Sequence, residues 1–162
     1  MSRNGVLLTI GSGILLFLSI GVALGGTDSP PQPINLPVAV NCDPVATACS
    51  AGNDDITLSL HLAGEVHPLK PFTVELDLRG RAAATVNKVT VGFAMVGMEM
   101  GENAFKLVRG ADGVWQGQAM LPICSHGRRD WRVTVEAAGE ALYTAPFNLQ
   151  VGPGSEPAGN GL

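Results

Sequence analysis

The sequence predicts an all-β fold, an immunoglobulin-like antiparallel β-sandwich of about seven strands, preceded by one apolar N-terminal segment. Period-2 alternation of apolar and polar residues recurs along the chain, and turn residues separate the alternating segments. No stretch after residue 27 keeps a helical period. The Cys…Trp…Cys spacing of antibody domains is missing, so the prediction concerns the architecture only.

Residues 1–26 are predicted to be a membrane anchor or a signal segment. Residues 5–26 carry no charge, and Val6–Leu24 is long enough to span a bilayer, which takes about 20 residues. Arg3 precedes this segment, which places the N-terminus in the cytoplasm and the rest outside. We therefore expect a single-pass protein of the cell inner membrane with its C-terminal domain in the periplasm. The alternative is a cleaved signal peptide, with Ala23-Leu24-Gly25 as the cleavage site and a secreted or periplasmic product.

Residues 27–54 are predicted to be a proline-rich stalk that carries two cysteines. The stretch "TDSPPQPINLPVAVN" holds four prolines, which favour an extended spacer. Cys42 and Cys49 enclose "DPVATA", and a turn favoured by Asp43-Pro44 would allow a disulfide between them if their Cα atoms approach within about 7 Å. Pairing of one of them with Cys124 is the alternative, and either way one of the three cysteines is left over.

The predicted sandwich domain covers residues 55–151. In the segment "WRVTVEA", for example, Trp131, Val133 and Val135 face one way, and the residues between them are polar. The expected strands are 56–62, 72–78, 89–95, 104–108, 114–121, 131–137 and 143–151. Residues 152–162, "GPGSEPAGNGL", are a Gly/Pro-rich tail that we expect to be disordered.

Three methionines cluster in "GFAMVGMEMGEN". Met95 continues the inward face of its strand, whereas Met98 and Met100 follow the regular alternation and are expected to be exposed on one side of the sheet rim. Thioethers are soft ligands that suit Cu(I). Without a metal, the same methionines form an adaptable contact surface for another protein.

A second group of soft ligands lies in "MLPICSHGRRDW". Alternate loops of an up-and-down sheet lie at the same end, so this loop is expected beside the methionine loop. The predicted copper ligands are Met98, Met100, Cys124 and His126, with Met95 and Met120 as weaker candidates. Arg128 and Arg129 form either a solvated turn or a contact for a carboxylate of a partner.

Other classes of function find little support in the sequence. The net charge is −4, which argues against nucleic-acid binding. His61 and His67 are expected to be solvated surface residues, and no spacing typical of zinc ligands is present. No catalytic triad is recognisable, so we expect a protein that is not an enzyme.

The ordered pieces "FAMVGMEMGENAFKLV", "GVWQGQAMLPIC" and "GRRDWRVTVEA" resemble the periplasmic domain of the FixH and YtkA-like family over roughly residues 55–151. Members are similar to immunoglobulin-like sandwiches tethered by one N-terminal helix, and the FixH branch is associated with assembly of copper-containing terminal oxidases. The resemblance implies an accessory role in copper handling or oxidase assembly, with a protein partner in a membrane complex. A structural module of such a complex that binds no metal is the alternative.

Overall fold

The seven predicted strands are all present. The computed structural model describes residues 32–98, 101–123 and 129–151. The predicted strands correspond to β3 (Thr57–Ala63), β4 (Pro71–Arg79), β5 (Lys88–Met95), β6 (Ala104–Arg109), β7 (Trp115–Met120), β8 (Asp130–Ala138) and β9 (Leu142–Gln150). Two short strands precede them, β1 (Ile34–Asn35) and β2 (Cys49–Gly52), and a 3₁₀ turn covers Ala82–Ala84.

Within the described ranges the fold is all-β, with no α-helix. No helix in this part of the chain is therefore long and apolar enough to cross a membrane. The predicted anchor of residues 1–26 and the predicted tail of residues 152–162 lie outside the described residues.

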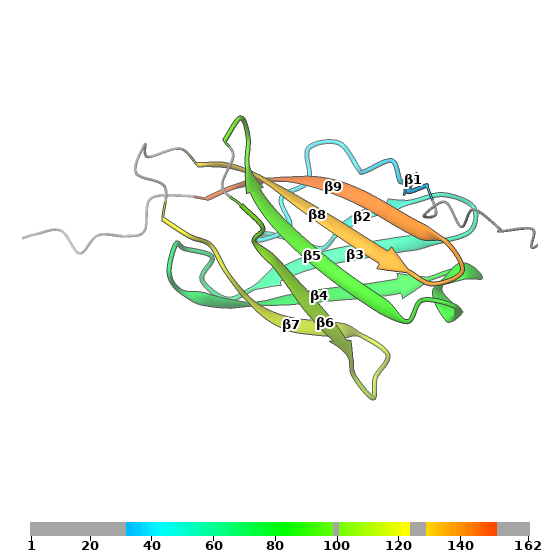
Figure 1. Cartoon of the computed structure of the whole chain (residues 1–162). Coiled ribbons are helices and arrows are strands. Elements are labelled where there is room, and N and C mark those ends of the chain that lie inside the picture. The colour runs from blue at the N-terminus through cyan, green and yellow to red at the C-terminus, as the bar shows by residue number, and fades with distance from the viewer. Residues whose placement is uncertain (1–31, 99–100, 124–128, 152–162) are drawn as a thin grey trace, which may run out of the picture. The chain divides into compact units, whose positions relative to one another are not determined.

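The nine strands form one curled mixed sheet in the order β1-β9-β8-β5-β6-β7-β4-β3-β2 (Figure 1). Only β1 runs parallel to its neighbour β9, and the other pairs are antiparallel. Strand β6 pairs with β5 along its first residues and with β7 through Val108 and Arg109, so it passes from one half of the sheet to the other. The two halves enclose the core: the rings of Phe72 in β4 and Phe93 in β5 meet edge to face, with centroids 5.5 Å apart.

The core follows the period-2 pattern of the sequence. Alternate residues of β3, β4, β5, β8 and β9 are buried, and the residues between them are exposed or half-buried. No polar or charged residue among those described is fully buried. The largest fully buried side chains include Phe93, Phe147, Ile56, Leu58, Leu60, Leu62, Leu76 and Leu149.

Residues 32–54 are part of this sheet, which corrects the predicted stalk. Leu36, Cys49 and Ala51 are 3%, 0% and 2% exposed and belong to the core. The segment joins both edges of the sheet, since the N–H of Leu36 donates to the carbonyl of Thr144 (2.8 Å) and the N–H of Ala39 to that of Ser50 (2.9 Å). The domain boundary predicted at residue 55 is therefore wrong. The sequence did not reveal this, because the segment packs into the core without a regular alternation of apolar and polar residues.

The first of the two cysteine pairings is the one observed. Cys42 and Cys49 form a disulfide with a Cα–Cα distance of 5.7 Å. Asp43 shapes the enclosed turn, because its carboxylate accepts the N–H of Val45 (3.0 Å) and its carbonyl accepts that of Ala46 (3.1 Å). Pairing of either cysteine with Cys124 is thereby excluded, and Cys124 is the cysteine left over.

Candidate functional site

The described parts of three loops meet at one end of the sheet, which we call the loop end: residues 64–70, residues 96–98 with 101–103, and residues 121–123 with 129. The N–H of Val96 donates to the carbonyl of Asp130 (3.1 Å), so the loops after β5 and after β7 share a base. The N–H of Leu69 donates to the carbonyl of Leu121 (2.9 Å), which joins the loop after β3 to the same end. The bases of the loop after β5 and the loop after β7 therefore lie at one end of the sheet, as expected.

The methionines occupy different environments. Met95 is buried in the core, as predicted. Met98 is half-buried and packs against the core, so its predicted exposure is wrong. The cause is a turn at Val96 and Gly97: Gly97 has a φ of 75°, and the N–H of Met98 reaches the carbonyl of Met95 (3.3 Å). Met120, in contrast, is 43% exposed.

Four of the predicted site residues lie outside the described residues: Met100, Cys124, His126 and Arg128. Arg129, the residue before β8, is exposed. Its backbone carbonyl accepts the N–H of Val151 (3.0 Å), and this hydrogen bond holds its backbone in place beside the end of β9. Among the described residues, no group of three or more His, Cys, Asp and Glu side chains is arranged to hold a metal ion.

Two polar side chains at the loop end were missed as site residues by the sequence analysis. His67 is half-buried rather than solvated, and its Nδ1 has no hydrogen-bond partner among the described residues. The Nδ2 of Asn103 is in the same situation. Leaving a buried polar atom without a hydrogen bond costs about 1–3 kcal/mol of folding free energy. A hydrogen bond from a bound group to either atom would remove this cost. No signal in the sequence distinguished His67 from a surface histidine.

The loop end also exposes apolar side chains. The exposed apolar residues are Leu69, Val96, Met120 and Ile123, and each of the three loops or its neighbouring strand end contributes at least one of them.

The pKa of the nearby Glu65 carboxyl is lowered, chiefly by the hydrogen bond and charge of Lys70 and further by His67. The described part of the loop end therefore combines exposed apolar side chains with the thioethers of Met98 and Met120 and the imidazole of His67.

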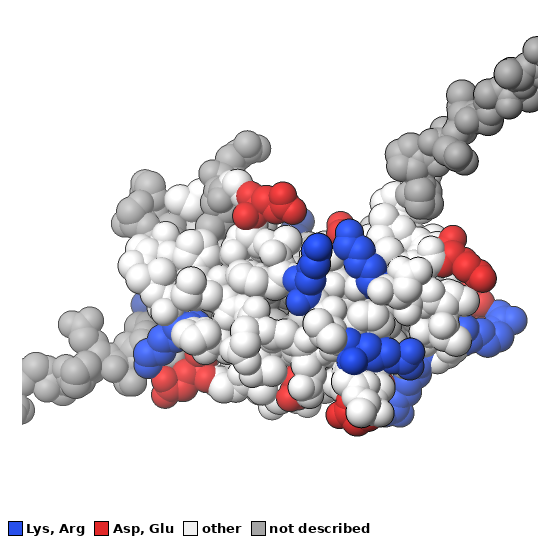
Figure 2. All heavy atoms as spheres, turned by 60° about the horizontal axis from the view of Figure 1, so that its bottom comes forward, with Lys and Arg blue, Asp and Glu red and all other residues white. Residues whose placement is uncertain are grey.

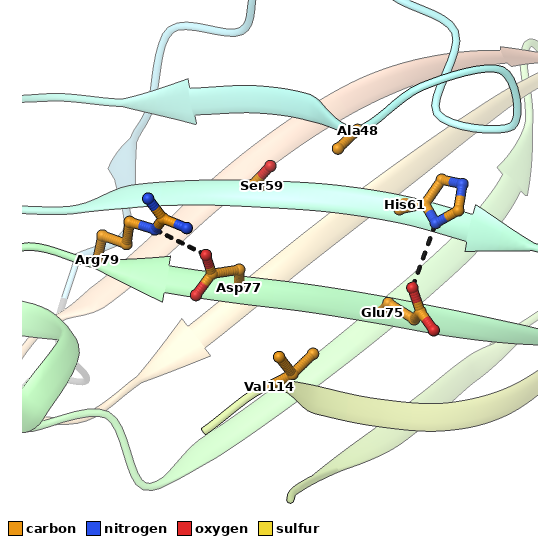
Figure 3. A pocket seen from close by; sticks show the side chains of 7 residues that line it. All are labelled: Ala48, Ser59, His61, Glu75, Asp77, Arg79 and Val114. Carbon is orange, nitrogen blue, oxygen red and sulfur yellow. Dashed lines mark hydrogen bonds and ion pairs between the residues drawn. The ribbon is translucent and has the colours of Figure 1, made fainter. Parts of the chain in front are cut away.

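A hollow of about 440 Å³, lined by polar and apolar side chains, lies on the outer face of β3 and β4 (Figure 3). His61 and Glu75 face each other across the two strands, with Nδ1 and Oε2 3.2 Å apart, and the Nε of Arg79 donates to Asp77 (2.7 Å). Ala48 and Val114 lie at its sides. His61 lies on the polar face, as predicted. Four of the lining side chains already contact each other in pairs, Arg79 with Asp77 and His61 with Glu75.

Charges elsewhere on the described surface are mixed. Figure 2 shows acidic and basic side chains interspersed on one face, with broad uncharged areas between them. This distribution agrees with the small net charge of −4 and forms no basic stripe on that face.

Neither a protein-family model nor a curated protein sequence matches this chain.

Proposed function

We propose that this protein is an exported accessory factor in copper handling or in assembly of a copper-containing respiratory oxidase, and that its loop end binds Cu(I). The ligands would be Met98, Met100, Cys124 and His126. The observation that carries the proposal is the hydrogen bond from Val96 to Asp130, because it joins the bases of the two loops that hold these residues.

The disulfide supports the proposal in a second way. Because Cys42 pairs with Cys49, Cys124 is not used in an intramolecular disulfide. A thiolate and thioethers are the soft donors that Cu(I) prefers, and an imidazole completes such a set. Met98 packs against the core on one side, which would hold its thioether in a fixed position beside the loops. His67 and Met120 are further donors at the same end.

The cellular setting that we propose follows from the same features. A disulfide is typical of an oxidising compartment, which supports export to the periplasm. The apolar residues 6–24 would anchor the chain in the inner membrane or, in the alternative, be removed as a signal. We place the curled sheet in the immunoglobulin-like sandwich class, and we propose that the domain carries no enzymatic activity of its own.

Competition with a Cu(I) chelator under reducing conditions tests the proposal. The full chain should take copper from the chelator, and Met98→Leu with Met100→Leu should weaken its affinity by at least tenfold, because leucine keeps the apolar volume and removes both sulfur ligands. Met95→Leu is the matched control, since this methionine lies in the core and should leave affinity unchanged. Equal affinity of the double variant and the wild type would contradict the proposed ligands.

A second candidate function is an interaction module that binds no metal. The exposed Leu69, Val96, Met120 and Ile123 favour it, because clustered apolar surface marks contact sites. Arg129, exposed at the same end, would meet a carboxylate of the partner. If this second function is correct, the wild type should bind no Cu(I). The double variant Leu69→Glu, Ile123→Glu should no longer co-purify with the membrane complex that the wild type binds.

A further inference from the structure

Strand β9 has an edge that the described chain covers only in part. Strand β1 pairs with Tyr143 and Thr144, at the start of β9. After Leu36 the chain leaves β9 and turns to β2, where Val38 bridges Ala51. In Figure 1, β1 accordingly lies beside one end of β9 and not along its length. The remainder of the edge, residues 145–150, has no neighbouring strand among the described residues.

The hydrogen bonds show which backbone groups of β9 point outward. The carbonyl of Thr144 accepts the N–H of Leu36, so the even-numbered residues direct their backbone groups away from β8. The N–H of Val151 donates to Arg129, so the odd-numbered residues face β8. Pro146 fits this pattern, because it lacks an N–H and lies where the β8 ladder needs none. The outward groups are therefore the carbonyls of Pro146, Asn148 and Gln150 and the N–H groups of the last two.

A groove of about 400 Å³ runs along this edge. Pro146 and Asn148 form one wall, and the segment Val38–Cys42 forms the other. Val40 on that segment is 86% exposed. None of the lining residues is charged, so the edge lacks the lysines that commonly protect exposed strands from pairing.

We propose that β9 pairs with β9 of a second copy of this chain, antiparallel and about a two-fold axis near Asn148. This part of the edge is self-complementary. With Asn148 opposite Asn148 of the second copy, each Asn148 N–H meets an Asn148 carbonyl, and each Gln150 N–H meets a Pro146 carbonyl. The outward N–H groups of Asn148 and Gln150 are then both hydrogen-bonded in each chain. Pro146 takes part only through its carbonyl, so its missing N–H does not weaken the Asn148 pair.

Pro146 and β1 restrict the pairing to this part of the edge. A two-fold axis at Pro146 would place the two Pro146 residues opposite each other, and neither has an N–H to donate. An axis at Thr144 is excluded because Thr144 already pairs with β1. The side chains on the outward face, from Pro146, Asn148 and Gln150, are uncharged, so no like charges meet across the new strand pair. The pairing would also cover the exposed Val40 beside the groove.

Cross-linking of the full chain in detergent tests the proposal. In a Cys124→Ser background, Asn148→Cys should be joined to itself by a short bifunctional maleimide. Pro146→Cys and Gln150→Cys should each cross-link poorly alone, because the two copies of either residue would lie about 13 Å apart along the strand, at 3.3 Å per residue. A mixture of these two variants should cross-link efficiently. Gln116→Cys, exposed on the central strand β7, is the control for random collisions.

Amide exchange and molar mass provide the second readout. The N–H groups of Asn148 and Gln150 should become protected as protein concentration rises, together with a doubling of the molar mass measured by light scattering. Cross-linking of Asn148→Cys no faster than Gln116→Cys, with a monomeric mass at every concentration, would overturn the proposal. Protection of both amides that is independent of concentration would also overturn it, because it would place a segment of the same chain on the edge.

Discussion

At Val96 and Gly97 the chain turns, and this turn moves Met98 from the rim of the sheet to the edge of the core. The sequence places Met98 correctly after the strand that ends at Met95. It does not reveal the turn, because Gly97 is compatible with both an extended and a left-handed backbone. The burial of His67 is likewise hidden, since it depends on how the loop of residues 64–70 packs and not on any local pattern.

The half-buried position of Met98 leads to a prediction about stability. Met98→Ala should lower the free energy of unfolding by about 1–2 kcal/mol, less than for a fully buried methionine, because only part of the side chain packs on the core. Met98→Leu should change it by less than about 1 kcal/mol, since the apolar volume is kept. Urea denaturation measures both. An alanine variant as stable as the wild type would show that Met98 does not contribute to the core.

At the scale of strands, alternation in the sequence located β3, β4, β5, β8 and β9, because each exposes one face and buries the other. The shorter strands β6 and β7 were located with the help of the turn residues between them. Strands β1 and β2 escaped prediction for a physical reason. They are 2 and 4 residues long, too short for a period to be recognised, and Pro33 and Pro37 flank β1. The place of β1 in the sheet depends on a partner that is distant in sequence, since it pairs with Tyr143 and Thr144 of β9.

The turn after β4 gives a test at this scale. Gly80 has a φ of 102°, and a Cβ there would collide with the carbonyl oxygen of Asp55. Gly64, after β3, has a similar φ of 96° but no atom within 4 Å of its Cβ position. Gly64→Ala should therefore cost only the backbone strain, about 1–2 kcal/mol, and Gly80→Ala clearly more. Thermal unfolding of the two variants compares them, and equal losses would argue against the close approach at Gly80.

At the scale of the whole described domain, the segment of residues 32–54 ties β9 to β2, and the disulfide closes a loop within it. The sequence predicted the pairing of Cys42 with Cys49 as one of two alternatives. It could not choose between them, because the choice depends on the burial of Cys49 beside β3, which is a tertiary contact. The shared end of the loops after β5 and after β7 was predictable, since it follows from counting strands.

Reduction of the disulfide should destabilise the domain without unfolding it. Its two cysteines are separated by 7 residues in sequence, and a loop of that length contributes about 2.5 kcal/mol in the chain-entropy treatment. Denaturation with and without reductant measures this difference, and a Cys42→Ala, Cys49→Ala variant should show no dependence on reductant. Alkylation of the unreduced, denatured, metal-free chain should modify Cys124 alone, and modification of Cys42 would contradict the pairing.

Copper K-edge X-ray absorption of the full chain loaded with Cu(I) tests the proposed site most directly, because it identifies the atoms bound to the metal. We predict a first shell dominated by sulfur with an imidazole contribution, losing sulfur scatterers in the Met98→Leu, Met100→Leu variant and again in Cys124→Ser. The Met95→Leu control should leave the spectrum unchanged. A chain that retains no copper, or a shell of nitrogen and oxygen atoms that none of these variants alters, would contradict the proposal that the loop end is a Cu(I) site.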